Sequence, residues 1–224
     1  MNKHYAFTDI HGDYELWTSI KNYCDDTDVI IFLGDACDRG KDGIKIMQEL
    51  LADKRVIYLM GNHELMFLKG IKDYFNQDGE TFFSNYHLWI SNGGSPTIEQ
   101  FLSLNKEEQN NLYYSIKNLG ICCSYQNKFL CHSGCSFKDL LTKDKKEIDF
   151  LWNRQHFEED ISDLFTDKII IHGHTPVQYF NNNTQEIYRY CNGKKIDIDM
   201  GAFFSKVVAL LDLDSLIPIY FSKK

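Results

Sequence analysis

The sequence predicts an α/β fold in which two β-sheets form a sandwich flanked by helices. Short apolar runs alternate with amphipathic helical patterns in the first third of the 224-residue chain, which is typical of a sheet covered by helices. A second set of strand patterns begins after residue 120 and continues almost to the last residue. No Pro- or Ser-rich linker separates the two parts. We therefore expect a single domain that covers residues 1–224.

The first part consists of three strand–loop–helix units. Strands are predicted from short apolar runs at residues 5–8, 29–33 and 56–59. Helices are predicted at residues 14–23 and 41–52, from apolar residues at helical spacing, and a third helix is predicted after Gly61-Asn62-His63-Glu64, through about Lys69. Each loop between a strand and its helix carries acidic or histidine side chains, so we expect one crowded, polar edge of the sheet.

The rest of the chain is predicted to be helical first and then β-rich. Residues 89–94 (WISNGG) are predicted to form a turn before a helix near residues 97–102. Asn105 is predicted to cap a helix over residues 106–118, in a capping box with Glu108. Hairpin turns are predicted at Gln126-Asn127 and Asn192-Gly193. The later strands are predicted at residues 121–125, 128–131, 168–171, 187–190, 195–198, 207–211 and 217–221.

The composition excludes some classes of function. A net charge of −8 argues against nucleic acid as the main partner, because phosphate backbones bind basic surfaces. It does not exclude a phosphorylated substrate, because bound metal ions reverse the local field. Seven irregularly spaced cysteines favour reduced thiols and a cytoplasmic location over a disulfide framework. We see no signal segment and no apolar run of roughly 18–20 residues, so we expect no membrane association.

Oxygen and imidazole side chains follow the predicted strands. Oxygen donors mixed with imidazoles suit manganese, iron or zinc, and two such ions that share one carboxylate are a usual arrangement for attack on phosphate. In Asp9-x-His11, alternate side chains leaving a strand are expected to converge on one ion. The candidate residues are Asp9, His11, Asp35, Asp38, Asn62, His63, His132 and His174.

Each motif taken alone has a simpler explanation. An isolated Asp-x-His is more often a turn with a helix cap than a pair of ligands. His132 or His174 alone is explained by a hydrogen-bonded histidine at a strand end, and Arg154 by a surface cation stacked on Trp152. A metal site is favoured because the motifs occur together and in order.

In that order the motifs resemble the calcineurin-like metallophosphoesterases, and within them the compact bacterial and phage Ser/Thr phosphatases of the phosphoprotein phosphatase branch. The resemblance spans nearly the whole chain and implies a four-layer αββα arrangement. It rests on DIHG (9–12), GDACDRG (34–40), GNHE (61–64), WISNGG (89–94), HSG (132–134), LWNR (151–154), GHTP (173–176) and IDIDMGAF (196–203).

The resemblance implies two divalent metal ions as cofactors, manganese first, with iron or zinc as alternatives. Asp35 is implied to bridge the two ions. The first ion would be held by Asp9, His11 and Asp35, and the second by Asp35, Asn62, His132 and His174.

The same resemblance implies hydrolysis of phosphomonoesters, with a phosphorylated protein or peptide as the substrate. A hydroxide that bridges the two ions would attack phosphorus in line. His63 would be the general acid that protonates the leaving alkoxide, and Asp38 would orient it. Arg39, Arg154 and Asn62 would bind the substrate phosphate, a role that suits the planar guanidinium group.

Two alternatives stay open. A dinucleoside polyphosphate hydrolase shares these motifs but often has Asp in place of Glu64, and a non-catalytic phosphate-binding module would lack a ligand or His63. The broader superfamily often ends in Gly-His-x-His, whereas GHTP supplies only His174, which favours the phosphoprotein phosphatase branch. His172 is not expected to join the site.

The remaining conspicuous residues are expected to be structural. Cys37 is expected to pack in the interior, and the charged run at residues 143–147 to be solvated. Surface or packing roles are expected for His4, His87 and His156, and core packing for the aromatic residues Phe75, Phe82, Phe83, Tyr86 and Trp89.

Overall fold

The first sheet is built from both ends of the chain. The computed structural model describes residues 2–76, 85–141, 147–159, 167–180 and 186–223, and the strand order of this sheet is β10-β9-β1-β2-β3. The three strands β1, β2 and β3 are parallel, and β9 and β10 are added antiparallel at one side. The bounds are His4–Phe7 (β1), Val29–Phe32 (β2), Val56–Tyr58 (β3), Val207–Asp212 (β9) and Pro218–Ser222 (β10).

The second sheet has the order β4-β5-β6-β8-β7. Its three central strands β5, β6 and β8 are parallel, and an antiparallel strand lies on each side. The bounds are Cys122–Tyr125 (β4), Lys128–Cys131 (β5), Ile169–His172 (β6), Tyr188–Tyr190 (β7) and Lys195–Asp197 (β8).

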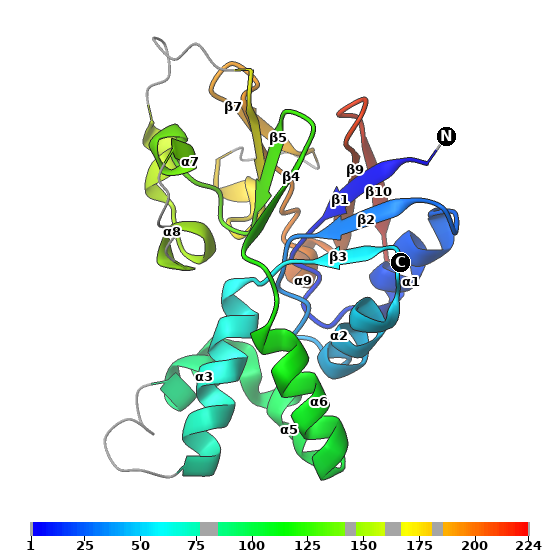
Figure 1. The fold of residues 1–224 in the computed structure, drawn as a ribbon, viewed down its shortest axis with the longest axis vertical. Coiled ribbons are helices and arrows are strands. Elements are labelled where there is room, and N and C mark those ends of the chain that lie inside the picture. Colours follow the sequence, from blue (N-terminus) through cyan, green and yellow to red (C-terminus); the bar gives the residue numbers. More distant parts are fainter. Residues whose placement is uncertain (1, 77–84, 142–146, 160–166, 181–185, 224) are drawn as a thin grey trace.

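Alternation of side chains along the strands creates the layers. Ala6 of β1 and Ile31 of β2 point to the second sheet, where they pack with residues such as Leu130 and Ile171. The neighbouring residues of β1 and β2 point the other way, onto helices α1 (Tyr14–Tyr23) and α2 (Gly43–Ala52). Helices α7 (Phe137–Leu141) and α8 (Glu147–Leu151) cover the outer face of the second sheet. Figure 1 shows this order of helices, sheet, sheet and helices.

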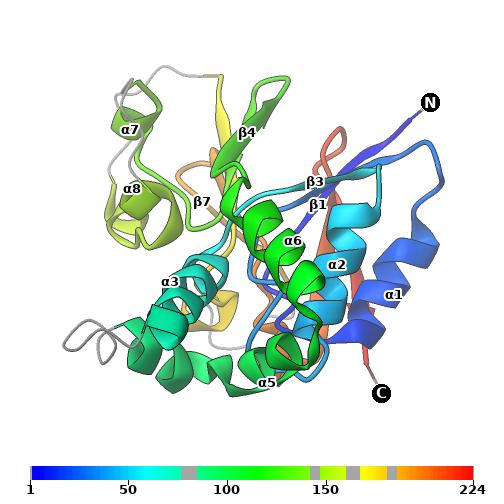
Figure 2. The ribbon, with the colours of Figure 1, turned by 60° about the horizontal axis from the view of Figure 1, so that its bottom comes forward.

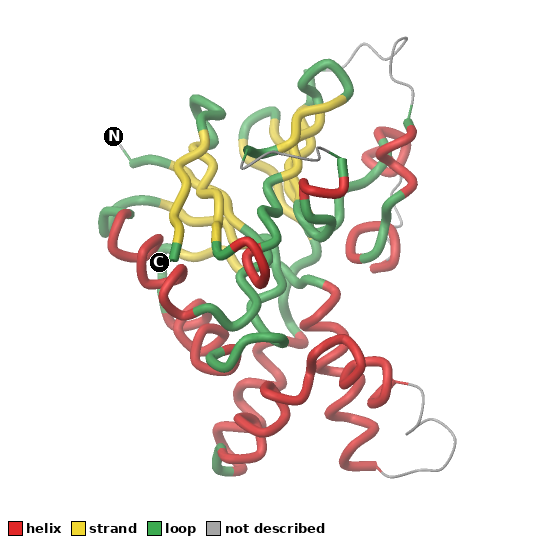
Figure 3. Tube along the Cα trace, turned by 180° about the vertical axis from the view of Figure 1, so that it is seen from behind, coloured by secondary structure: helices red, strands yellow, loops and turns green. Residues whose placement is uncertain are grey.

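A group of longer helices closes one end of the sandwich. Figure 2 brings them forward: α5 packs against α2, and α6 packs against α3. Seen from behind, the two groups of strands lie side by side above these helices (Figure 3). The helices are α3 (Asn62–Asn76), a helical stretch at residues 85–89, the π-helix η1 (Ile90–Gly94), α5 (Ser95–Ser103) and α6 (Lys106–Lys117).

Most predicted elements are present within one or two residues of their expected bounds. The capping box of Asn105 and Glu108 at the start of α6 is confirmed. Both predicted hairpins are confirmed as antiparallel pairs, β4 with β5 and β7 with β8. The two-sheet α/β sandwich flanked by helices is therefore the fold.

Two predictions about the helical part are only partly right. The helix predicted to follow Glu64 and to end at about Lys69 begins at Asn62 and continues to Asn76, because its apolar face keeps packing beyond Gly70. The turn predicted at residues 89–94 is present as a kink at Gly93, with φ +101°, where two helices join. The residues on either side of the kink are helical, which the Gly-Gly pair did not indicate.

Several short elements had no clear signal in the sequence. They are η2 (Gln155–Glu158), η3 (Val177–Tyr179) and α9 (Ala202–Ser205), besides α7 and α8. Most of the charged run at 143–147 lies outside the described residues. Within the described ranges, no helix is both long enough and apolar enough to span a membrane. The expectation of one domain over residues 1–224 stays a prediction.

Candidate active site

The candidate residues gather where the carboxyl ends of the parallel strands of both sheets meet. Two hydrogen bonds connect the halves: His132 Nδ1 donates to the Leu33 carbonyl at 2.9 Å, and the His174 amide donates to Asp9 Oδ2 at 2.9 Å. Side chains that are far apart in the sequence thus share one buried region. The first sheet supplies Asp9, His11, Asp35, Asp38, Asn62 and His63, and the second supplies His132 and His174.

The backbone of the site is unusual. Six site residues have left-handed φ angles between 44° and 73°: Asp9, His11, Asp35, Asp38, Arg39 and His174. They are six of the eleven non-glycine residues with positive φ in the described part of the chain. This region is costly for residues with a Cβ and is typical of functional sites. Asp9 and His11 do converge as expected, with 3.9 Å between Asp9 Oδ1 and His11 Nε2, but they do so through left-handed loop conformations and not through the alternation of a strand.

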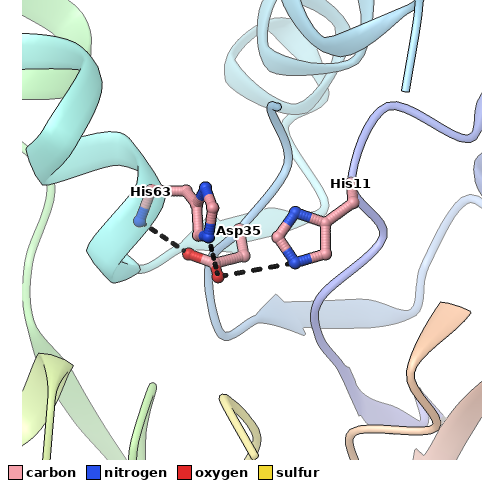
Figure 4. Close-up of side chains that lie close together, drawn as sticks. All are labelled: His11, Asp35 and His63. Atoms are coloured by element: carbon pink, nitrogen blue, oxygen red, sulfur yellow. Dashed lines mark hydrogen bonds and ion pairs between the residues drawn. The ribbon is translucent and has the colours of Figure 1, made fainter. Parts of the chain in front are cut away.

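Asp35 lies at the centre of a buried cluster, between His11 and His63 (Figure 4). Its Oδ2 is 3.7 Å from His11 Nε2 and 3.9 Å from His63 Nε2, and its Oδ1 accepts the His63 backbone N–H at 3.0 Å. Asp35 also belongs to an overlapping group with Asp9 and His132. The potential ligand atoms of each group lie within 4.8 Å of one another, so each group could hold a metal ion. Asp35 is the carboxylate common to both.

In two histidines, a hydrogen bond from Nδ1 to a backbone carbonyl leaves the lone pair of Nε2 directed into the cluster. His11 Nδ1 donates to the Cys37 carbonyl at 3.0 Å, and His132 Nδ1 donates to that of Leu33. Burial lowers the pKa of both imidazoles, so each is neutral near pH 7 and carries its lone pair on Nε2. A histidine whose second nitrogen is fixed by a carbonyl is the usual metal-ligating arrangement.

A second set of donors converges on Asn62. Its Oδ1 lies 2.8 Å from His132 Nε2 and 2.8 Å from His174 Nδ1. Because His132 Nε2 carries a lone pair, it and Asn62 Oδ1 are two hydrogen-bond acceptors that face each other. A cation bound between them would remove this repulsion. The buried Nε2 of His174 has no hydrogen-bond partner among the described residues. Asn62, His132 and His174 thus fit a metal ion by the chemistry of their donors.

The charges of the cluster also favour binding of a cation. Burial raises the pKa of Asp35 well above its usual range, and the neighbouring Asp9 and Glu64 carboxylates raise it further. Burial, followed by the charge of nearby His132, lowers the pKa of His174 well below the ordinary value. The cluster therefore combines crowded carboxylates with neutral imidazoles, which is unfavourable without positive charge and suits divalent ions.

His63 and Asp38 form a hydrogen-bonded pair beside this cluster. His63 Nδ1 donates to Asp38 Oδ2 at 2.7 Å, and both side chains are buried. Burial raises the pKa of Asp38 to about 7, while hydrogen bonds from Thr97 and Trp89 act in the opposite direction. Arg39 Nη2 lies 3.1 Å from His63 Nε2, and since a guanidinium cannot accept, His63 Nε2 accepts this bond.

An open cleft of about 1010 Å³ leads to the cluster. Arg39, Arg154 and His174 line it, so both arginines of the sequence prediction reach the same space. Arg154 Nε donates to Thr175 Oγ1 at 3.2 Å, which fixes the guanidinium at the wall. Exposed aromatic rings form part of the rim, namely Tyr179, Phe203 and Phe204.

Residues 3–201 match the family model of the calcineurin-like phosphoesterases. The chain belongs to this family. Phosphoester hydrolysis is the activity that the match supports, and the non-catalytic alternative loses its basis, because the chain has His63 and the complete set of candidate ligands.

Two curated relatives of this phosphoesterase carry different names. Serine/threonine-protein phosphatase 2 of Salmonella typhimurium is 27% identical over 211 residues, which cover 88% of this chain and 86% of that protein. An asymmetrical bis(5'-nucleosyl)-tetraphosphatase of Oceanobacillus iheyensis is 27% identical over 180 residues, covering 66% of this chain and 62% of that protein. The relatives support hydrolysis of phosphoesters and leave the substrate open.

A solved structure shares the fold of this phosphoesterase. It is a protein proposed to be a diadenosine tetraphosphatase, and it superposes with a TM-score of 0.68, 13% identity, and coverage of 100% of this chain and 94% of that one. At that identity the likeness concerns the fold alone.

The structure gives Glu64 of the phosphoesterase a place that the sequence analysis missed. Its buried carboxylate accepts hydrogen bonds from the backbone N–H groups of Asp35, Ala36 and Gly61, each at 2.8 Å, and from the Tyr58 hydroxyl at 2.9 Å. It therefore fixes the loop after β2 to the start of α3. The final letter of GNHE was the available signal.

Trp89, Thr97 and Asp199 were missed as well. The indole N–H of Trp89 and the hydroxyl of Thr97 both donate to the Asp38 carboxylate. Asp199 is buried near Asp9: burial and the charge of Asp9 raise its pKa well above the usual range. WISNGG and IDIDMGAF were visible as motifs, but sequence alone did not show what their side chains contact.

His156 and His172 lie outside the metal cluster, as expected. Both are buried and hydrogen-bonded to the Tyr190 hydroxyl, at 2.9 Å and 2.7 Å. Cys37 packs in the main core. Among the aromatic residues, Trp89 is buried, but Phe75 is about half exposed, so its predicted core role is wrong. Phe82 and Phe83 lie outside the described residues.

Proposed function

We propose that this phosphoesterase removes phosphate from phosphorylated serine and threonine side chains of proteins. The observation that carries the proposal is the buried His63–Asp38 pair beside the Asp–His cluster. An alkoxide is a poor leaving group without a proton, and this pair can supply one at the cleft. The Salmonella relative named as a serine/threonine-protein phosphatase supports the same substrate class.

Two divalent ions are the proposed cofactors, with manganese first and iron or zinc also suited to the donors. Asp9, His11 and Asp35 would hold one ion, and Asp35, Asn62, His132 and His174 the other. Facing acceptors, crowded carboxylates and the unpartnered His174 nitrogen support this fit. Bound there, the ions would supply positive charge opposite the phosphoryl oxygens and lower the pKa of an attacking water.

The protein side chains would complete the reaction. Arg39 and Arg154 bind the phosphoryl oxygens, and Asn62 assists. When Arg39 turns from His63 to the phosphate, His63 Nε2 would take up a proton from solvent. The attacking water would lose a proton to solvent as its oxygen bonds to phosphorus, the ester P–O bond would break, and the leaving oxygen would take the Nε2 proton of His63. Asp38 stabilises the protonated imidazole through Nδ1.

A phosphoserine peptide assayed with added manganese tests the proposal. We expect hydrolysis that a chelator abolishes and manganese restores. We expect His63→Asn to reduce kcat by roughly 10²–10⁴-fold with metal content unchanged. Full activity of His63→Asn would contradict the general acid, and chelator-resistant activity would contradict the metal assignment.

A dinucleoside polyphosphate is the second candidate substrate. Exposed rings at the cleft, Tyr179, Phe203 and Phe204, are able to stack on bases, and the Oceanobacillus relative is named as a tetraphosphatase. Comparing kcat/KM for the phosphoserine peptide and for diadenosine tetraphosphate separates the two candidates. A clear preference for diadenosine tetraphosphate would overturn the protein-phosphatase proposal and leave the metal chemistry intact.

A further inference from the structure

The segment from Trp89 to Thr97 packs against the loop that carries Asp38 and Arg39. It comprises the end of the helical stretch at residues 85–89, the π-helix η1 and the first turn of α5. We call it the clasp segment. The chain kinks inside this segment at Gly93, which has a φ of +101°. Three contacts of the clasp segment with the catalytic loop decide what it does.

The first contact secures the carboxylate of Asp38. The Trp89 indole N–H lies 3.0 Å from each oxygen, and the Thr97 hydroxyl donates to Oδ1 at 2.7 Å. His63 Nδ1 occupies Oδ2. Both carboxylate oxygens are thus fixed in a fully buried position, and outside the clasp segment the Asp38 carboxylate is hydrogen-bonded by His63 and by the neighbouring Cys37 thiol.

The second and third contacts secure the strained backbone. Asp38 and Arg39 have φ angles of 69° and 64°, and their N–H groups need partners. The Thr97 hydroxyl oxygen accepts the Asp38 N–H at 2.9 Å, and the Gly93 carbonyl accepts the Arg39 N–H at 2.9 Å. Gly93 approaches closely: a Cβ there would lie 2.9 Å from Arg39 Cγ.

Two glycines leave the space that the Trp89 ring occupies. Trp89 is fully buried, and its ring lies against two glycines. A Cβ on Gly70 would lie 2.4 Å from Trp89 Cε3, and one on Gly94 would lie 2.6 Å from Nε1. Packing fixes the indole so tightly that its N–H has one direction.

We propose that Trp89 and Thr97 are positioning residues, which hold Asp38 so that it orients His63 for proton donation to the leaving group. This inference rests on the proposed function of His63. Neither residue lines the cleft, and in the described part of the chain their side-chain hydrogen bonds go to Asp38 and not to a candidate metal ligand. Their loss should therefore slow the step that needs a proton and leave metal binding unchanged.

The choice of leaving group distinguishes a positioning role from a purely structural one, because a structural defect would affect all substrates alike. A phosphoserine peptide releases an alkoxide that needs a proton, whereas p-nitrophenyl phosphate releases a phenolate that departs without one. We expect Thr97→Val and Trp89→Phe to lower kcat on the peptide by about tenfold, as for loss of a hydrogen bond to a charged group, and on the aryl phosphate by less than about twofold. Thr97→Ser keeps the hydroxyl and should restore peptide activity.

Trp17→Phe is the matched control. Trp17 is also fully buried and donates its indole N–H to a carboxylate, that of Glu49, but in α1 away from the site. It should change both activities equally or not at all. Manganese content and thermal midpoint of each variant check that the site and the fold are intact.

The outcomes separate the two proposals. If His63→Asn shows the leaving-group-selective loss and Thr97→Val does not, the positioning role is wrong and the general acid stands. If His63→Asn itself loses both activities equally, the proposed function of His63 fails first. If Trp89→Phe is unstable, Thr97→Val and its Ser counterpart decide alone. Equal loss on both substrates in Thr97→Val would also overturn the inference.

Discussion

At the scale of single residues, Asp35 and Asp38 show how one loop gives two carboxylates different surroundings. Asp35 faces imidazole nitrogens of His11, His63 and His132 at 3.5–3.9 Å and lacks a neutralising partner there. Asp38 is saturated by donors from His63, Trp89 and Thr97. The first is arranged to share a cation, and the second to hold an imidazole in one orientation.

Exchange of each aspartate for asparagine should separate these roles. We expect Asp35→Asn to weaken manganese binding by roughly tenfold or more, because a charged ligand common to both groups is lost. Asp38→Asn should retain manganese and lower kcat by roughly 10²-fold or more, because His63 loses the partner that stabilises its protonated form. Calorimetric metal titration and steady-state kinetics measure the two effects. Normal metal affinity in Asp35→Asn would refute the shared-ligand assignment.

The burial of His156 predicts that the free energy of unfolding depends on pH. Its Nε2 donates to the Ser133 carbonyl, and its Nδ1 accepts from Tyr190 of β7, with Lys195 of β8 and His172 of β6 close by. Burial lowers the pKa of His156 to about 4. The unfolded chain therefore binds this proton first as the pH falls below about 6.5, so stability is complete above that value and is lost between about 6.5 and 4.

This single group should contribute about 3 kcal/mol to the loss of unfolding free energy over that range. Denaturant titrations at pH 7 and pH 4.5 on the wild type and on His156→Gln measure it, since Gln keeps a donor and does not titrate. The variant should show a shallower decline at acidic pH. Parallel declines of the two proteins would remove His156 from the explanation.

At the scale of elements, the sequence signals were strongest where they were local. Short apolar runs predicted the strands closely, and helical spacing predicted α1 and α2, because burial decides those elements. The helix cap at Asn105 was also predicted correctly from the sequence. The role of the clasp segment was not predicted, because Trp89 meets Asp38 across 51 positions and no local pattern encodes that contact.

The cap of α6 gives a test that is independent of the active site. Asn105→Ala removes the acceptor of the Glu108 N–H and breaks the capping box. We expect a loss of about 1 kcal/mol in unfolding free energy, with kcat unchanged. Asn110→Ala, on the exposed face of the same helix, is the matched control and should have little effect on stability. A changed kcat in Asn105→Ala would show that α6 reaches the site.

At the scale of the whole molecule, the site lies where the two sheets meet. The motifs predicted which residues gather there, since strand ends of parallel strands share an edge. They did not predict the left-handed backbone of six site residues, nor the buried support from Glu64. Those features arise from contacts between distant segments, which sequence spacing does not display.

Binding of divalent ions should stabilise the whole chain. Without a cation, the crowded carboxylates around Asp35 oppose folding. We expect manganese at about 100 times its Kd to add roughly 2.7 kcal/mol to the unfolding free energy, and a chelator to remove it. Differential scanning calorimetry with and without manganese measures the shift. His174→Gln should reduce it, and an unchanged transition temperature in the wild type would contradict a folded-state metal site.

The hydrogen bond between Asp9 and the His174 amide joins residues that are 165 positions apart. Synthesis proceeds from the N-terminus, so both aspartates of the cluster leave the ribosome long before the histidines of the second sheet exist. The N-terminal half alone offers only part of a coordination sphere. The candidate site is therefore assembled only after the strand before His174 has been synthesised and has docked beside the first sheet.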